Sequence, residues 1–189
     1  MGTGELNFYV LDHEATFEDL KQFSYPHQKI GVIAHIENEK GEILLQQRGS
    51  KAFDEKGLYE DIGGKVEKED SSFKEAMIRE IEEEAGQDFC FALSDSIGIY
   101  HCEKKEIHWI FLIYFVKYIE GPIKIMEPEK CMGYQFFSYQ QAMNSKLVTE
   151  SCKYLIKSIE ENFGRYEKSP LKVLERYSHK NEKKNELRR

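Results

Sequence analysis

The clearest hydrophobic pattern in the chain predicts a helix between residues 72 and 85. Four apolar residues recur there at every fourth position and would form one stripe along the helix: Phe73, Met77, Ile81 and Ala85. Such a stripe is typical of an amphipathic helix that packs on a sheet. Ser72 and Glu75 have the spacing of a capping box at the start of this helix, and Gly86 supplies its end.

Most other apolar segments predict strands, because they are short, rich in β-branched and aromatic residues, and separated by turn residues. The expected strands are residues 6–11, 29–36, 42–48, 89–93, 96–101 and 107–118, and further helices lie near 16–20, from 138 and over 150–163. Strands interrupted by one central helix and closed by another predict a mixed α and β fold.

The length and the charge of the chain limit the number of domains and the classes of partner that it can have. The chain has 189 residues, enough for one domain with a full core, and 40% of them are hydrophobic. The net charge of −7 is uneven, because residues 165–189 hold nine Lys or Arg against four Glu and the rest of the chain is strongly acidic. An acidic body argues against a nucleic-acid partner, and an anionic substrate would need metal ions beside such a site.

The cysteines and the apolar runs point to a cytoplasmic protein. Cys90, Cys102, Cys131 and Cys152 show neither a C-x-x-C pair nor zinc-finger spacing, so we expect reduced thiols; a Cys90–Cys102 bridge is the alternative. The first residues lack the basic and apolar regions of a secretory signal, and the longest apolar run, residues 107–116, is about half the length of a membrane helix. We expect no membrane partner.

The predicted helix carries a concentration of negative charge near its end. Glu80, Glu83 and Glu84 fall on one face, because residues three and four apart are neighbours on a helix surface. Like charges at a helix C-terminus are unfavourable, although Arg79 can pair with Glu83 one turn away. A solvated acidic face is the simple explanation. Carboxylates held together on a rigid helix would also suit Mg²⁺, or Mn²⁺, whose charge offsets the repulsion.

Residues 64–87 resemble the Nudix box, the family pattern G-x5-E-x7-R-E-U-x-E-E-x-G-U, in which U is a bulky apolar residue. The matching positions are Gly64, Arg79, Glu80, Ile81, Glu83, Glu84 and Gly86. The chain departs from the pattern in three ways: Asp70 replaces a glutamate, one extra residue separates it from Arg79, and Gln87 replaces the last apolar residue. The extra residue falls near Ser71, where a loop can absorb it. Whether Asp70, Glu69 or Glu67 braces this loop against Arg79 is left open.

The resemblance implies an α/β/α sandwich with a mixed β-sheet over residues 28–164, with an N-terminal extension at 1–27 and a charged tail at 165–189. It also implies a metal-dependent hydrolase that cleaves a phosphoanhydride bond in a nucleoside diphosphate linked to another group, nucleoside triphosphate pyrophosphohydrolysis being one form of this reaction. Glu80 and Glu84 would bind Mg²⁺, Glu83 would share the metal or be held by Arg79, and the carbonyl of Gly64, or of neighbouring Gly63, would complete the site.

The resemblance also suggests residues outside the helix. Arg48 would contact phosphate at a strand end, Gly63 would let the backbone approach the substrate, and Trp109 would stack on a base; a surface arginine and a packing tryptophan are the simpler readings. Residues 126–137, MEPEKCMGYQFF, resemble a segment of Nudix members that cleave nucleoside triphosphates. Glu127, preferred to Glu129, would add a distant carboxylate, so the general base is Glu80 or Glu127.

Two other functions remain open at this point. A non-catalytic Nudix-fold module would bind a nucleotide without turnover. An isopentenyl-diphosphate isomerase relative would need a catalytic cysteine near histidines before the box, and residues 49–62 contain neither. The partner is expected to be a small-molecule nucleotide, but the sequence identifies neither that nucleotide nor the oligomeric state, a homodimer being one option.

Overall fold

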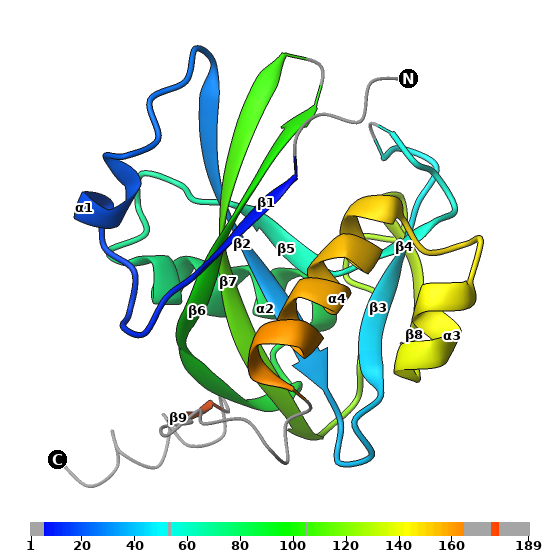
Figure 1. Cartoon of the computed structure of the whole chain (residues 1–189). Coiled ribbons are helices and arrows are strands. Elements are labelled where there is room, and N and C mark those ends of the chain that lie inside the picture. The colour runs from blue at the N-terminus through cyan, green and yellow to red at the C-terminus, as the bar shows by residue number, and fades with distance from the viewer. Residues whose placement is uncertain (1–5, 53, 105, 165–174, 178–189) are drawn as a thin grey trace, which may run out of the picture.

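A mixed β-sheet lies at the centre of the computed structural model, which describes residues 6–52, 54–104, 106–164 and 175–177 (Figure 1). Its strands in the described residues are β1 (Asn7–Val10), β2 (Gln28–Glu37), β3 (Ile43–Arg48), β4 (Tyr59–Glu60), β5 (Ile62–Lys65), β6 (Cys90–Lys104), β7 (Ile107–Glu120), β8 (Cys131–Phe137) and β9 (Glu175–Tyr177). The order is β1-β6-β7-β2-β3-β4, with β5 on β2, β8 on β3 and β9 on β6. Strands β2 and β7 run parallel and every other named pair is antiparallel, so the predicted mixed sheet is confirmed.

Helices cover both faces of this sheet. They are α1 (Phe17–Leu20), α2 (Phe73–Ala85), α3 (Tyr139–Asn144) and α4 (Glu150–Phe163). Figure 1 shows α4 in front of the sheet and α2 behind it. Alternation along β7 explains the layers: Leu112 and Tyr114 pack with the α2 residues, whereas Ile113 and Phe115 pack with Leu155 of α4. The predicted α/β/α sandwich follows from these two cores.

Helix α2 occupies the position that its apolar stripe predicts. All four stripe residues, Phe73, Met77, Ile81 and Ala85, are buried, and Gly86 ends the helix with a φ of 93°. The predicted capping box is only half formed. Ser72 Oγ accepts from the Glu75 amide at 3.1 Å, but the Glu75 carboxylate bonds Ser71 instead of the Ser72 amide. Ser71 offers both its amide and its hydroxyl as donors, whereas Ser72 would offer one amide.

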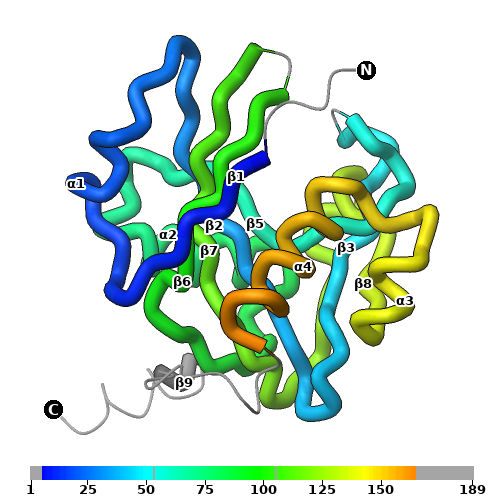
Figure 2. The backbone as a smooth tube through the Cα atoms, viewed as in Figure 1, coloured from blue at the N-terminus to red at the C-terminus, as the bar shows by residue number. Residues whose placement is uncertain are grey.

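The N-terminal residues are integral to the sheet. Strand β1 pairs antiparallel with β6, and Figure 2 shows its path along that strand. Helix α1 follows, and Leu20 and Phe23 enter the same core as α2. The short strand and the short helix predicted for this segment are therefore present. Of the predicted tail, residues 165–174 and 178–189 lie outside the described residues.

Two parts of the sheet differ from the sequence prediction. The segments 89–93 and 96–101 belong to one strand, β6, whose register with β7 shifts between Leu93 and Ser96 and again before Gly98. These irregularities interrupt the alternation that a regular strand would show, so the sequence suggests two strands. Strand β8 was not predicted at all, because its burial alternates poorly; it pairs with β3.

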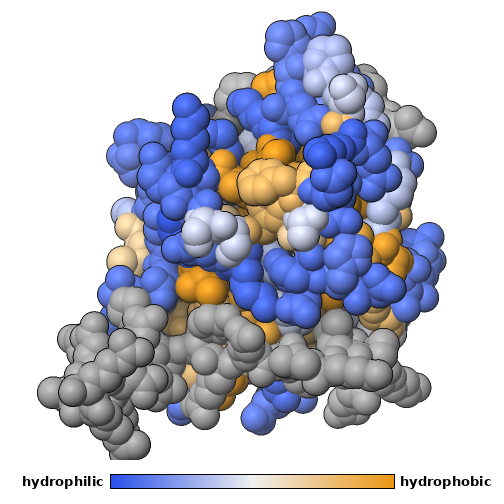
Figure 3. Space-filling model, turned by 90° about the vertical axis from the view of Figure 1, so that its left-hand side faces the viewer, coloured by the Kyte–Doolittle hydropathy of each residue, from blue (hydrophilic) through white to orange (hydrophobic). Residues whose placement is uncertain are grey.

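The cysteines and the surface agree with the sequence analysis. All four cysteines, Cys90, Cys102, Cys131 and Cys152, are buried and free, and Cys90 and Cys102 are not bridged in the structure. The side of the molecule on which α1 lies is largely hydrophilic, with one apolar area near its middle (Figure 3). None of the helices in the described residues combines the length and the hydrophobicity that a membrane crossing needs.

Candidate active site

The last two turns of α2 bring the three predicted carboxylates together. Glu80 is buried, Glu84 is half-buried and Glu83 is exposed. Burial raises the pKa of Glu80, and burial together with the charge of Glu80 raises the pKa of Glu84 to about 8. Two acids that are buried beside each other are unfavourable in the ionised state. A divalent cation between them would remove this cost.

The two glycines in the middle of β5, Gly63 and Gly64, lie against Glu84 and Glu80. The Gly63 amide donates to Glu84 Oε2 at 3.3 Å, and Gln46 Nε2 donates to the same oxygen at 3.2 Å. A Cβ added to Gly64 would collide with the Glu80 carboxylate. The absence of side chains at both glycines therefore lets the two carboxylates of α2 lie directly against the β5 backbone.

The strand ladder decides which glycine carbonyl faces the acids. The amide of Val66 donates to the Ile30 carbonyl at 3.1 Å, which fixes the phase of the antiparallel pairing between β5 and β2. Backbone groups alternate along such a ladder, so Gly64 directs its amide and carbonyl toward Val32 of β2. Gly63 directs both groups away from β2, in agreement with its hydrogen bond to Glu84.

A methyl group added at Gly63 should affect activity and stability differently from one added at Gly64. In Gly64→Ala the new Cβ meets the end of the flexible Glu80 side chain, so the carboxylate can move aside. We expect kcat/KM to fall roughly ten- to hundredfold with little loss of stability. In Gly63→Ala the new Cβ meets the Val32 carbonyl oxygen, which belongs to the backbone, so this variant should unfold more easily. Steady-state kinetics and thermal unfolding of both variants test this contrast; equal stability would contradict it.

Arg79 is the most highly bonded charged residue of the site. Its guanidinium binds both oxygens of Asp70, with Nε to Oδ1 and Nη2 to Oδ2 at 2.9 Å each. Nη1 donates to Glu80 at 2.8 Å and to Glu83 at 3.1 Å, and Nη2 donates to the Lys65 carbonyl at 3.0 Å. Asp70 therefore braces the loop, despite the extra residue, and the hydrogen bond from Arg79 lowers the pKa of Asp70.

A groove beside α2 contains the predicted distant carboxylate. Its cavity of about 940 Å³ is lined by Glu80, Glu83, Glu84 and Glu127, and a neighbouring cavity of about 520 Å³ also meets Glu84 and Glu127. The Glu127 side chain is 46% exposed and pairs with Lys130 at 2.8 Å. Glu129 pairs instead with Lys51 and lines only the smaller cavity. Glu127 is therefore the glutamate of this loop that faces the α2 acids.

Arg48 lies at the boundary of the site, but its guanidinium already has acidic partners. Nη2 pairs with Asp54 at 2.8 Å, Nε donates to the Asp54 carbonyl at 3.0 Å, and Nη1 pairs with Glu60. These bonds fasten the loop after β3 to strand β4. The arginine thus lines two cavities while its charge is balanced within the protein.

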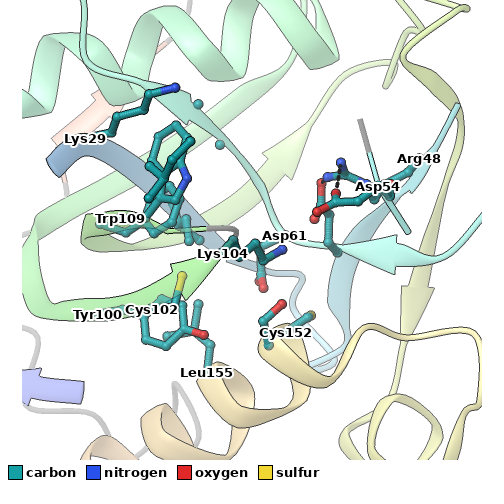
Figure 4. Close-up of a pocket in the computed structure, with 17 residues that line it drawn as sticks. Lys29, Arg48, Asp54, Asp61, Tyr100, Cys102, Lys104, Trp109, Cys152 and Leu155 are labelled. Atoms are coloured by element: carbon teal, nitrogen blue, oxygen red, sulfur yellow. Dashed lines mark hydrogen bonds and ion pairs between the residues drawn. The ribbon is translucent and has the colours of Figure 1, made fainter. Parts of the chain in front are cut away.

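Trp109 belongs to a third, more apolar cavity of about 420 Å³ on the α4 side of the sheet (Figure 4). Its ring stacks on Phe111 with centroids 5.1 Å apart, and Lys29 Nζ lies 5.3 Å from its ring centroid. Gly63 lines this cavity and both acidic ones. A ligand could therefore extend from the aromatic wall, past Gly63, to the glutamates of α2.

Two buried polar residues of this cavity were not predicted as site residues. Asp61 precedes β5, and Tyr100 lies in the middle of β6. Tyr100 lies in a segment that the sequence predicts as strand, Asp61 lies outside the predicted strands, and the two residues meet only through the tertiary fold. The only signal in the sequence is that the Asp61 carboxylate lies two positions before Gly63, and this signal is weak by itself. Tyr100 has no signal in the sequence.

The donor chemistry of the site fits a hard divalent cation. Carboxylate and carbonyl oxygens are the ligands that Mg²⁺ and Mn²⁺ prefer. Among the described residues, no group of three or more His, Cys, Asp or Glu side chains is already arranged around a metal position. Glu80 and Glu84 nevertheless lie together, and the Gly63 backbone lies between them and the apolar cavity beside Trp109. Two carboxylate side chains and one backbone carbonyl are therefore available to bind a metal ion.

Comparison with known proteins identifies the class. The NUDIX domain model matches residues 27–157, and the chain belongs to this family. It is a Nudix hydrolase, an enzyme of a family whose members generally use divalent metal ions and act on small nucleotides. This result favours a hydrolase over the alternatives of a binding module and an isomerase relative.

Individual proteins to which the chain is similar support this family assignment. Over 57 residues the chain is 46% identical to CTP pyrophosphohydrolase of Escherichia coli (strain K12), a match that covers 30% of this chain and 41% of that relative. The crystal structure of a MutT protein from Methanosarcina mazei Go1 has a TM-score of 0.63 at 25% identity and covers 74% of this chain and 96% of its own. A UDP-X diphosphatase structure shares the fold, with a TM-score of 0.55 at 22% identity, 77% of this chain and 69% of its own.

Proposed function

We propose that the chain is a Mg²⁺-dependent nucleoside triphosphate pyrophosphohydrolase, which releases a nucleoside monophosphate and pyrophosphate. One observation carries this proposal: Gly63 connects an aromatic cavity, suited to a base, to the paired acids Glu80 and Glu84, suited to a metal that binds phosphates. The similarity to a CTP pyrophosphohydrolase supports the same substrate class. Other nucleoside diphosphate derivatives are the wider group within which it falls.

The chain offers oxygen ligands for Mg²⁺, and Mn²⁺ would suit them equally. We assign Glu80 and Glu84 as ligands, with Glu83 at the exposed edge. The carbonyl of Gly63 is preferred to that of Gly64, because the ladder turns Gly64 toward β2. When bound, the metal would neutralise charge on the phosphate oxygens and lower the pKa of the attacking water.

The protein side chains would then orient the reactants. Water forms a bond to one of the two phosphorus atoms that flank the α,β-bridging oxygen, the bond from that phosphorus to the bridging oxygen breaks, and the other fragment leaves with the bonding electron pair. Attack at either phosphorus gives a nucleoside monophosphate and pyrophosphate. Glu127 would accept the proton of the water, since its carboxylate faces the groove and its ion pair with Lys130 lies at the surface, whereas Glu80 is buried against Arg79. Arg79 positions Glu80 and Glu83, and Arg48 holds the wall of the cavities through Asp54 and Glu60.

Glu127→Gln tests the proton acceptor. The amide keeps the shape of the side chain but cannot take the proton, so we expect kcat to fall about 100-fold with KM nearly unchanged. Glu129→Gln, on the same loop but paired with Lys51, is the matched control and should stay within twofold of the native enzyme. Equal losses in both variants would assign the effect to loop structure instead of proton transfer.

The function itself is tested by hydrolysis of a panel of nucleoside triphosphates and nucleotide sugars with Mg²⁺, with Mn²⁺ and with EDTA. We expect pyrophosphate from triphosphates only when a metal is present. Orthophosphate as the first product, or turnover confined to nucleotide sugars, would contradict the proposed substrate class.

We also propose a cytoplasmic location, because the four free cysteines suit a reducing compartment.

A further inference from the structure

Four residues line both of the acidic cavities beside α2, so they mark the place where these two cavities meet. They are Gly63, Glu84, Glu127 and Lys130. Gly63 also lines the aromatic cavity beside Trp109. A nucleotide whose base lies in the aromatic cavity would therefore bring its first phosphates past Gly63 to Glu84, and a third phosphate would extend into the acidic cavities.

A third phosphate would meet many carboxylates in this part of the site, so it needs a cation of the protein beside it. The other cations of the acidic cavities each form an ion pair and line only one of the two cavities: Arg48, Lys51, Lys65, Arg79 and Lys124. Lys130 is the cation that lies where the cavities meet. It is therefore the lysine best placed for the end of a phosphate chain.

The backbone of Lys130 is fixed, whereas its ammonium group can exchange partners. The Lys130 amide donates to the Glu127 carbonyl at 2.9 Å, and the Lys130 carbonyl accepts from the Gly49 amide. Nζ pairs with Glu127 Oε1 at 2.8 Å, and the two side chains are 67% and 46% exposed. An exposed ion pair of this kind is weak. A phosphate, with more charge and more acceptor oxygens, can therefore replace the carboxylate as the partner of Nζ.

We propose that Lys130 binds the terminal phosphate of the substrate and so makes the enzyme select nucleoside triphosphates over nucleoside diphosphates. The phosphates of a diphosphate would end near Glu84, so the ammonium group would stay with Glu127. A triphosphate would draw the ammonium group away and leave the Glu127 carboxylate open to the water. This inference rests on the proposed pyrophosphohydrolase function and names the residue that distinguishes the two lengths of phosphate chain.

The test compares kcat/KM for a nucleoside triphosphate and for the diphosphate of the same nucleoside in the native enzyme and in Lys130→Met. The nucleoside is the one among cytidine, uridine, adenosine and guanosine whose triphosphate the native enzyme cleaves fastest. We expect the native enzyme to prefer the triphosphate roughly 10- to 100-fold, the usual effect of one hydrogen bond between charged groups. Lys130→Met removes the charge and should lower this ratio about tenfold or more, while the diphosphate value stays nearly unchanged.

Two variants and one binding measurement separate phosphate binding from loop structure. Lys124→Met is the matched control, because Lys124 lines the larger cavity but pairs with Asp88, and it should leave the ratio unchanged. Lys130→Arg keeps the positive charge and should retain most of the preference. Calorimetry with inorganic pyrophosphate and Mg²⁺ needs no turnover, and we expect Lys130→Met to bind pyrophosphate about tenfold more weakly than the native enzyme.

Equal losses of triphosphate and diphosphate turnover in Lys130→Met would indicate a structural role in the loop and would overturn the inference. Unchanged binding of pyrophosphate would overturn it as well. So would a native enzyme without a preference for the triphosphate, whether or not Lys130→Met folds. The proposed function fails separately, if the native enzyme releases pyrophosphate from none of the four triphosphates.

Discussion

Glu84→Gln should reduce kcat/KM for metal-dependent hydrolysis by about 10³-fold. Loss of a residue that only supports a metal ligand costs roughly 10- to 100-fold, and loss of a proposed ligand should cost more. Glutamine retains the oxygen that accepts from Gly63 and Gln46, so the local structure should persist. Because the pKa of Glu84 is raised to about 8, this side chain is largely protonated in the metal-free protein at neutral pH. The neutral amide matches that state, so the melting temperature of the metal-free protein should not fall. Steady-state kinetics, Mg²⁺ titration and thermal unfolding measure these effects.

The matched control is Glu82→Gln. Glu82 lies on the same helix and lines the same groove, but the family pattern places no requirement on its position. Its substitution should change kcat/KM less than twofold. If Glu82→Gln were as damaging as Glu84→Gln, the general acidity of the helix would account for the activity. If Glu84→Gln kept more than a tenth of the activity and its Mg²⁺ dependence, Glu84 would not be a metal ligand.

The parts of the site that the sequence predicted are those that depend on local spacing. The stripe of α2 fixes which helix face is buried, so the relative positions of Arg79, Glu80, Glu83 and Glu84 follow from the helical period alone. The extra residue before the helix had no effect on this face, because Asp70 still reaches both nitrogen edges of the guanidinium. The mixed α and β class was likewise predictable from the order of the expected strands and helices, whereas the α/β/α layers were expected from the family resemblance.

The remaining features depend on contacts between distant segments. Arg48 is attractive as a phosphate ligand until the fold brings Asp54 and Glu60 to its guanidinium. Asp61 and Tyr100 are 39 positions apart in the printed sequence, and neither shows a motif that would connect them. The choice between Gly63 and Gly64 depends on the phase of a strand ladder, which no spacing in the sequence determines.

Arg79→Ala should weaken both the fold and the reaction. The substitution removes two hydrogen bonds to Asp70, whose side chain is 4% exposed, and one each to Glu80 and Glu83. The buried carboxylate of Asp70 would lose its charged partner and keep the Glu67 amide as a donor, so we expect the free energy of unfolding to fall by about 2–4 kcal/mol. Because Glu80 would lose its orienting contact, kcat/KM should fall about 100- to 1,000-fold. Urea denaturation and steady-state kinetics give the two values.

Two further variants separate charge from geometry at this position. Arg79→Lys keeps the positive charge but cannot bind both oxygens of Asp70 together with two glutamates, so it should recover less than half of the lost unfolding free energy. Asp70→Asn keeps most of the shape and should cost about 1 kcal/mol. If Arg79→Lys restored native stability and activity, charge alone would suffice. The planar, bidentate contact would then not be what joins the loop to the acidic face of α2.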